Sequence, residues 1–264
     1  MTDGLARDTR GELQSHEDFL AGILKRMPER LREETAARMA MAPEDRPPLQ
    51  QPKMVMALRG NGLEGDQLHN TFATYRTDNE PTRLEAKRQA VRFVHEVKTG
   101  TRTKGLHFYG RPGRGKDHLL HAITAELAKA RIDVYYGYAL DIKHKMLGEW
   151  QRHSDPETAI EERMSACKVL CIGDLHKVLY VRQYEGVRDR EVREAFMRVL
   201  NKASSTGSPL LCVSGNIDPQ DYASREFGGY DDGSGDIDGA IYSRLQGCTI
   251  AIEVQGQDMR QEQR

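Results

Sequence analysis

The sequence has few cysteines, few aromatic residues and almost no net charge. Only four of its 264 residues are cysteine, 6% are aromatic with a single tryptophan, and the formal net charge is −1. Cys167, Cys171, Cys212 and Cys248 stand in or beside apolar segments without paired C-x-x-C spacing, which favours buried thiols over a zinc site. Because there is no global basic field, any binding of nucleic acid must depend on local patches of charge.

Long hydrophobic runs are also missing. No apolar stretch approaches the roughly 20 residues needed to span a bilayer, and the N-terminus lacks a signal-peptide core. We therefore expect a cytoplasmic protein with no membrane segment. The length suits one α/β domain of about 200 residues with a small appendage.

What the sequence does contain is a phosphate-binding loop. Residues 110–117 read GRPGRGKD and fit the pattern G-x-x-x-x-G-K. Gly110, Gly113 and Gly115 let the backbone turn so that successive amide N–H groups converge on phosphate oxygens at a helix N-terminus. Lys116 adds a point charge for the β- and γ-phosphates. The loop therefore predicts a bound nucleoside triphosphate.

The flanks of the loop are those that such a loop requires, a strand before it and a helix after it. Residues 106–109 are short, apolar and aromatic, as a buried strand should be. Leu119, Ile123 and Leu127 recur every four residues and mark one face of a helix that ends near Ala130. We therefore prefer a phosphate loop to a chance glycine-rich turn.

Asp117 departs from the pattern, since a serine or threonine hydroxyl normally ligates Mg²⁺ at this position. A carboxylate is a hard oxygen donor that can still reach the metal, but it brings negative charge close to the phosphates. We therefore expect nucleotide binding to depend on Mg²⁺ more steeply than usual. His118 follows and is included among the expected nucleotide-binding residues.

A second acid is expected at the end of a buried strand, residues 168–174. ATPases of this kind usually carry two acids there, one that orders the Mg²⁺ water shell and one that polarises the attacking water. Here Gly173 takes the first place and only Asp174 remains. Asn216 follows the next apolar strand, residues 210–214, where its amide either orients a water against the γ-phosphate or forms a turn.

The chain divides into three regions. Residues 1–42 carry an apolar stripe on helical stretches too short for a core of their own, which must pack on a partner, a second copy or the main domain. Residues 43–80 form a proline-rich linker and an irregular lead-in. Residues 81–264 form the main domain, which opens with a helix from Pro81 to Gly100.

Strands and helices alternate along the main domain. Strands are expected at residues 106–109, 133–137, 168–172, 210–214 and 249–254. The helical stretches between them favour right-handed βαβ units. This alternation predicts an α/β fold with a central five-stranded parallel sheet flanked by helices.

In this order, the motifs resemble those of the DnaC-type replicative helicase loaders of the AAA+ initiator clade, with the IstB-type transposition helper ATPases as near relatives. The phosphate loop alone is shared by many NTPases, whereas the ordered set is much more specific and covers most of the chain. It consists of residues 24–28 (LKRMP), 68–75 (LHNTFATY), 110–119, the strand to Asp174, 241–245 (IYSRL) and 256–260 (GQDMR).

The resemblance implies a role for each matching residue. Lys116 would bind the phosphates of ATP or ADP with Mg²⁺, Asp174 would be the catalytic acid, and Asn216 would be the sensor-one residue. Arg244 would be an arginine finger that completes a neighbouring subunit's site, and Arg260 would be the sensor-two arginine. Because such a finger acts only between correctly apposed subunits, the resemblance also implies a ring or spiral.

Two departures from the family fall around the metal. Gly173 replaces the metal-ordering aspartate, and Asp117 replaces a threonine or asparagine. In one account Asp117 supplies the carboxylate that Gly173 lacks, so that Asp117 and Asp174 hold Mg²⁺ together. In the other, hydrolysis is slow or absent while nucleotide binding is retained. We expect weak hydrolysis.

A cationic segment follows the second expected strand. Lys143, Lys145, Trp150 and Arg152 combine charges for phosphates with an aromatic ring for base stacking, as single-strand binding requires. The alternative is a solvated helix with Trp150 packed inward. In the family this part of the module faces the central channel and contacts single-stranded DNA, so the resemblance favours DNA binding.

The resemblance thus implies an ATP-controlled loader that binds a hexameric, DnaB-like replicative helicase through residues 1–42 and helps place it on single-stranded DNA. Two alternatives stay open. An IstB-like transposition helper would act on duplex DNA with a transposase. A nucleotide-gated interaction protein would have no useful ATPase activity, and the missing acid at Gly173 motivates that interpretation.

Overall fold

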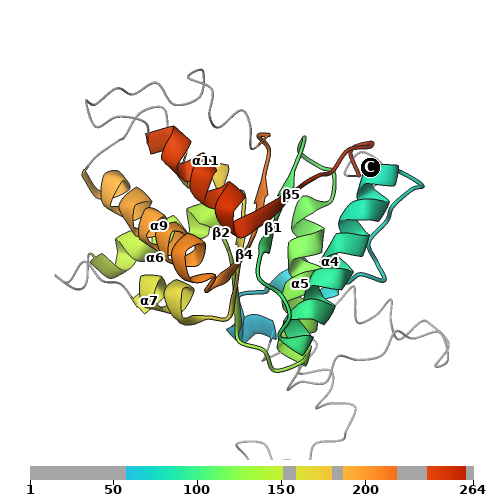
Figure 1. Cartoon of the computed structure of the whole chain (residues 1–264), viewed down its shortest axis with the longest axis horizontal. Coiled ribbons are helices and arrows are strands. Elements are labelled where there is room, and N and C mark those ends of the chain that lie inside the picture. The colour runs from blue at the N-terminus through green and yellow to red at the C-terminus, as the bar shows by residue number, and fades with distance from the viewer. Residues whose placement is uncertain (1–57, 151–158, 180–186, 219–236, 260–264) are drawn as a thin grey trace, which may run out of the picture. The chain divides into compact units, whose positions relative to one another are not determined.

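The fold is a five-stranded parallel sheet with helices on both faces, as the sequence predicts (Figure 1). A computed structural model describes residues 58–150, 159–179, 187–218 and 237–259. The expected partner-binding helices of residues 1–42 and the proline-rich part of the linker lie outside these ranges. The elements in chain order are η2 (Gly65–His69), α4 (Pro81–Thr99), β1 (Gly105–Tyr109), α5 (Lys116–Lys129), β2 (Val134–Tyr138), α6 (Ala139–Trp150), α7 (Ala159–Ala166), β3 (Val169–Gly173), α8 (His176–Leu179), α9 (Val187–Thr206), β4 (Leu210–Gly215), α11 (Ile237–Cys248) and β5 (Thr249–Glu253).

The strand order is β2-β3-β4-β1-β5, and every neighbouring pair is parallel. The carboxyl ends of β1, β3 and β4 therefore meet at one edge of the sheet, which is where open α/β sheets bind their ligands. Each observed strand begins and ends within one residue of its expected bounds. The agreement has a simple cause, since every residue of β3 and β4 is buried and their apolar runs are continuous.

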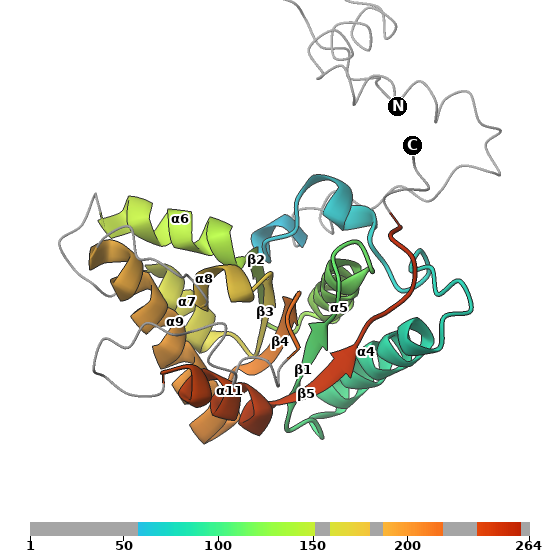
Figure 2. The same ribbon diagram turned by 90° about the horizontal axis from the view of Figure 1, so that it is seen from above.

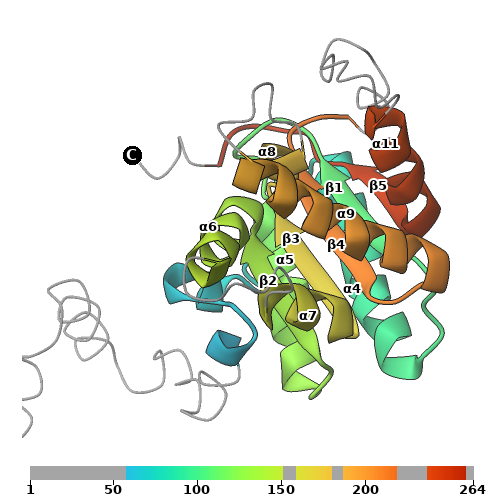
Figure 3. The same ribbon diagram turned by 90° about the vertical axis from the view of Figure 1, so that its left-hand side faces the viewer.

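The helices form two layers, one on each face of the sheet. α4 and α5 cover one face, and α6, α7, α9 and α11 cover the other, as Figure 2 and Figure 3 show from two further directions. Phe93 and Ile123 are buried in the first layer, Met146 and Phe196 in the second. Each such side chain contributes about 1.5–3 kcal/mol by burial. Among the helices of the described ranges, none is long and apolar enough to cross a membrane.

Helix α4 begins and ends where the sequence predicts. Pro81 occupies the first turn, where its missing N–H group needs no partner, and the Glu80 side chain accepts a hydrogen bond from the Thr82 backbone at 3.3 Å. Gly100 closes the helix in the left-handed conformation with φ of 75°. The helix thereby positions its buried face against α5.

The lead-in from residue 58 to residue 80 packs as part of the folded domain. Leu58 and Leu63 are fully buried in the layer formed by α4 and α5. The Tyr136 backbone N–H group donates to the Asn61 carbonyl at 2.9 Å, so the lead-in lies against edge strand β2 at Asn61. The lead-in therefore shields part of an otherwise open sheet edge.

All four cysteines are free and buried, which confirms the prediction of buried thiols. Burial raises the pKa of the Cys167 thiol to about 12 and that of Cys248 to about 11. Since a thiol reacts as its thiolate, Cys167 and Cys248 are inert near neutral pH. They fill space between the sheet and its helices.

Candidate nucleotide-binding site

The phosphate loop joins β1 to α5, in the strand-loop-helix context that the sequence predicts. Gly110 and Gly115 have φ values of 132° and 91°, a region that other residues rarely adopt, and Gly115 is the N-cap of α5. The first amide N–H groups of α5 therefore face the loop. Together with the helix dipole they form a binding site for phosphate oxygens.

Lys116 is buried within this loop. Its side chain is 5% exposed, and Nζ donates hydrogen bonds to the carbonyl oxygens of Gly110 at 2.7 Å and Arg111 at 2.9 Å. The ammonium charge is thus held beside the amide N–H groups at the start of α5. Charge and dipole act together on any anion in the loop.

Asp117 and Asp174, the two expected metal ligands, are connected through Ser214. Asp117 Oδ1 accepts a hydrogen bond of 2.5 Å from the Ser214 hydroxyl, whose oxygen accepts one of 3.0 Å from the Asp174 backbone N–H group. Ser214 is fully buried on β4. Lys177 Nζ lies 2.6 Å from Asp174 Oδ2. The structure therefore brings the start of α5 and the end of β3 together through the intervening strand.

This donor set fits Mg²⁺. The ion is usually held by one or two carboxylates together with phosphate oxygens and water, and Asp117 and Asp174 supply two hard oxygen donors next to the phosphate loop. In the part of the chain that the structure describes, no group of three or more His, Cys, Asp or Glu side chains forms a metal site by itself. A metal here would depend on the bound nucleotide for the rest of its shell.

Gly173 has a steric reason to be glycine. It pairs in register with Tyr138 of the neighbouring strand β2. A Cβ at position 173 would lie 2.6 and 2.8 Å from two atoms of the Tyr138 ring, and 3.2 Å from the Tyr136 hydroxyl. An aspartate, which the resemblance to the DnaC-type loaders implies at this position, would therefore require the Tyr138 ring to shift.

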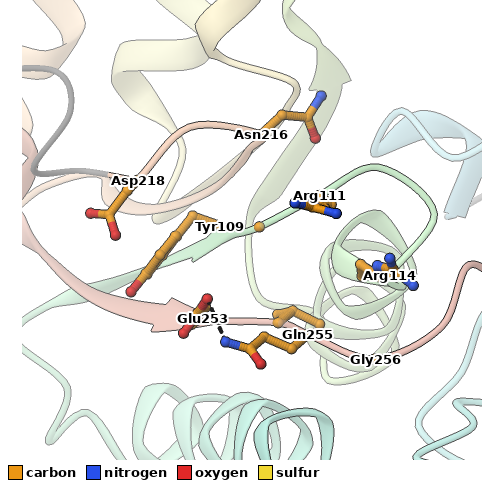
Figure 4. Close-up of a pocket in the computed structure, with 10 residues that line it drawn as sticks. Tyr109, Arg111, Arg114, Asn216, Asp218, Glu253, Gln255 and Gly256 are labelled. Carbon is orange, nitrogen blue, oxygen red and sulfur yellow. Dashed lines mark hydrogen bonds between the residues drawn. The ribbon is translucent and has the colours of Figure 1, made fainter.

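A pocket of about 480 Å³ opens beside the loop, at the carboxyl ends of β1, β4 and β5 (Figure 4). Arg111 and Arg114 project from the loop on one side of it, and Asp218 and Glu253 lie toward the other. Asn216, the expected sensor, lines the same pocket. The structure therefore places Asn216 close to the phosphate loop, although Asn216 and Lys116 are 100 residues apart in sequence.

His176 is a neighbour of Asn216 that sequence reasoning missed. Its Nε2 lies 3.4 Å from Asn216 Nδ2, and its Nδ1 is buried without a hydrogen-bond partner in the described ranges. Burial is the main cause that lowers the pKa of His176. The residue follows Asp174 by two positions, and that proximity was the only available signal in the sequence.

The segment after β5 returns across the phosphate loop. The Met259 backbone N–H group donates to the Gly113 carbonyl at 3.0 Å, and a Cβ at Gly113 would lie 1.9 Å from Asp258 Oδ1. A Cβ at Gly115 would lie 2.9 Å from the Tyr75 ring and 3.4 Å from the Met259 sulfur. The lead-in and the C-terminal segment therefore meet at the loop.

Arg83 of α4 holds this C-terminal segment in place. The side chain is 1% exposed; its guanidinium donates to the Gln255 carbonyl at 3.0 Å, to Asp78 Oδ2 at 2.8 Å, and to the Gln257 carbonyl. It was not among the expected site residues. Nothing local predicts its contact with the C-terminal segment, because the two backbone carbonyls to which it donates are more than 170 residues away.

The side chains of His118 and Arg244 contact residues outside the phosphate loop. His118 Nε2 lies 2.8 Å from the Thr71 carbonyl, and its ring packs edge-on against Tyr75, so it contacts the lead-in. Arg244 is on α11 and donates to the Asn201 side chain on α9. The family roles given to both stay predictions.

The expected DNA-binding residues are described only in part. Lys143 and Lys145 lie on α6, where Lys145 is exposed and Lys143 half-buried. The side chain of Trp150, at the end of α6, and Arg152 lie outside the described residues, as do Arg260 and most of the glycine- and aspartate-rich stretch 228–239.

Solved structures of replication proteins share this fold. The crystal structure of DnaI is 26% identical, with a TM-score of 0.56, and the match covers 75% of this chain and 94% of that chain. The DnaC helicase loader is 17% identical, with a TM-score of 0.56, covering 73% and 100%. AMPPCP-bound DnaA from Aquifex aeolicus is 18% identical, with a TM-score of 0.55, covering 75% and 53%. No family model matches the chain.

The fold and the phosphate loop define the class of the protein, a AAA+ ATPase of the replication-initiation type. Within that class the chain resembles the DnaC-type helicase loaders, as its ordered motifs predict. The similarity to DnaI carries this conclusion, because the other two structures, at lower identity, bear on the fold alone.

Proposed function

We propose that this protein is an ATP-controlled loader that binds a hexameric replicative helicase through residues 1–42 and helps place it on single-stranded DNA. The observation that carries the proposal is the similarity to DnaI, which extends over nearly the whole of that chain and includes the phosphate-loop domain. The described domain has its own two-sided core, and this supports assigning partner binding to the separate segment of residues 1–42.

The nucleotide would be held by the phosphate loop and the two carboxylates beside it. The backbone N–H groups of the loop and Lys116 would bind the phosphates, while Asp117 and Asp174 would ligate Mg²⁺. Mg²⁺ held by Asp117 and Asp174 would supply positive charge that neutralises the negative charge developing on the phosphates. The usual site has a neutral hydroxyl and two acids on the strand; here one acid has moved to α5, so the number of carboxylates is unchanged.

The remaining residues would couple the nucleotide to assembly. Asn216, beside His176, is positioned at a strand end to orient a water toward the terminal phosphate. Arg244 would reach a neighbouring subunit's nucleotide once its contact with Asn201 is given up. ATP binding would then stabilise a ring or spiral of subunits, and hydrolysis or release would dissolve it.

Replacing Asp117 with alanine should reduce the Mg²⁺ dependence of nucleotide binding. The wild type should bind ATP about 100-fold more tightly with Mg²⁺ than in EDTA, because the carboxylate attracts the metal and repels bare phosphates. The variant should show a ratio of about tenfold or less, and it should bind ATP in EDTA more tightly than the wild type does. Titration calorimetry with and without EDTA measures both ratios.

Asp133→Ala is the matched control for Asp117→Ala, since Asp133 pairs with Arg163 at the opposite end of β2 from the site. The ratio of its ATP affinity with Mg²⁺ to that in EDTA should equal the ratio of the wild type. A wild-type affinity that EDTA leaves unchanged would contradict the assignment of Asp117 to the metal. Loss of any measurable ATP turnover in Asp117→Ala would support compensation for Gly173.

The loader function itself is tested by co-purification with the replicative helicase of the same host. The full chain should form a complex in the presence of ATP or ADP, and a chain lacking residues 1–42 should not, since the proposal assigns binding to that segment. Absence of a complex with the full chain under both nucleotides would rule the loader function out. Binding to duplex DNA and a transposase instead would favour the transposition-helper alternative.

A second candidate function, a nucleotide-gated interaction protein without useful hydrolysis, is favoured by one observation. The Tyr138 ring occupies the space of the missing acid, so the site lacks the usual metal-ordering group on β3. In that case the chain would still bind the helicase in a nucleotide-dependent way. Turnover measurements on the assembled complex distinguish the two candidates.

A further inference from the structure

A chain of hydrogen bonds runs through the protein interior toward the metal side of the site. Asn70 Nδ2 lies 2.8 Å from His121 Nδ1, and His121 Nε2 lies 2.8 Å from the Tyr136 hydroxyl. The Tyr136 ring packs edge-on against the Tyr138 ring, with 5.6 Å between the two ring centroids. His121 and Tyr136 are only 3% and 2% exposed. The phosphate loop's own residues take no part in this chain.

Both hydrogen bonds run in the same direction, from Asn70 toward Tyr136. The Asn70 amide can only donate through Nδ2, so His121 Nδ1 accepts and the His121 proton is on Nε2, from which it is donated to Tyr136. Burial, which lowers the pKa of His121 to about 3, keeps the ring neutral. The Tyr136 hydroxyl therefore accepts the hydrogen bond from His121, and the Tyr136 ring packs edge-on against the Tyr138 ring.

Tyr138, the last residue of this group, lies beside Gly173. It is the last residue of β2, and its ring lies over Gly173, in the space where the family carries an acid. Asp117, Asp174 and Asp141 all lie near enough to raise the pKa of its phenol, to which burial contributes most. The phenol is therefore protonated at neutral pH. The region between Asp117 and Asp174 is the side of the loop where a terminal phosphate would lie.

We propose that Tyr138 takes the place of the missing acid and is a specificity-determining residue for nucleoside triphosphate, with its hydroxyl donating a hydrogen bond to the terminal phosphate. This inference rests on the proposed nucleotide site, and it is independent of the helicase partner. A neutral donor suits the altered site because Asp117 already supplies the second negative charge. The hydrogen bonds from Asn70 through His121 hold Tyr136 in place, and the Tyr136 ring packs against the Tyr138 ring and positions it.

The first test separates the hydroxyl from the ring. Tyr138→Phe keeps the ring over Gly173 and removes only the donor. We expect the affinity for a non-hydrolysable ATP analogue to fall about tenfold, with little change for ADP and in the melting temperature. Equilibrium titration with both nucleotides gives the two affinities. Tyr135→Phe is the matched control, because Tyr135 is on the same strand and contacts Arg163 elsewhere.

The outcomes of this titration are distinct. Unchanged affinity for both nucleotides, or an equal loss for both, would overturn the inference, since the hydroxyl would then have no selective contact with the terminal phosphate. A wild-type chain that binds neither nucleotide would overturn the nucleotide site as well. A selective loss in Tyr138→Phe without helicase binding by the wild type would support the inference and refute the loader function.

The second test exchanges the two side chains. Gly173→Asp should lower the melting temperature by roughly 5 °C or more, because its side chain meets the Tyr138 ring. Tyr138→Ala removes the ring, so adding Gly173→Asp should then lower the melting temperature little further. The double variant should also recover selectivity for the triphosphate, because the acid is restored. The two effects on stability should therefore be strongly non-additive. Additive effects, or a double variant without selectivity, would contradict the replacement.

Discussion

Replacing Lys116 with alanine is expected to weaken ATP binding at least about 100-fold, which is the largest effect of any single change at the site. The side chain is buried inside the loop, where water screens its charge poorly, and Nζ already lies beside the loop carbonyls of Gly110 and Arg111. A phosphate in the loop would lose this charge and keep only the backbone N–H groups. Titration calorimetry with a non-hydrolysable ATP analogue measures the loss.

Lys129→Ala is the matched control for this change. Lys129 is on the same helix, in its last turn, and it forms an exposed ion pair with Glu126. Its removal should leave ATP affinity unchanged and cost less than about 1 kcal/mol of stability. If folded Lys116→Ala protein bound ATP as tightly as Lys129→Ala protein, the loop would not be the phosphate site.

Replacing Arg83 with methionine is expected to destabilise the domain by about 3 kcal/mol, since three hydrogen bonds from a buried charged group are lost together. Two of those bonds go to the backbone at Gln255 and Gln257 and hold the C-terminal segment against α4. That segment crosses the loop at Gly113, so nucleotide affinity should fall as well. Thermal unfolding should show a melting temperature lower by roughly 6–12 °C.

Arg92→Met is the comparison for Arg83→Met. Arg92 is on the same helix and forms an exposed ion pair with Glu96. Its loss should change the melting temperature by no more than about 2 °C. Equal effects of the two substitutions would show that the hydrogen bonds of Arg83 do not stabilise the C-terminal segment.

Much of the fold could be predicted because its signals are local. The phosphate loop, its flanking strand and helix, the glycine that ends α4, and the five apolar strands each depend on residues close together in sequence. An apolar run forms a buried strand whichever strands become its neighbours, so the first and last residues of each strand do not depend on the strand order. The position of Asp174 at a strand end follows from the same pattern.

The missed residues of the site depend on distant contacts. Ser214 joins Asp117, 97 residues away, to Asp174, 40 residues away. Tyr138 directly follows the expected strand of residues 133–137 and was not among the expected site residues; the register of β2 against β3 places it beside Gly173. No local pattern encodes either contact, because each depends on which strands become neighbours.

The sequence by itself predicted a phosphate-loop domain that resembles the DnaC-type loaders, with Asp117 and Gly173 departing from the motif where a metal is expected. Only the tertiary structure shows which side chains occupy the space of the acid missing at Gly173. Packing β2 beside β3 brings the Tyr138 ring into the space of the missing acid, and packing β4 beside β3 brings the Ser214 hydroxyl between the Asp117 carboxylate and the Asp174 backbone N–H group. Strand order is set by burial over the whole sheet, so these neighbours exist only in the folded chain.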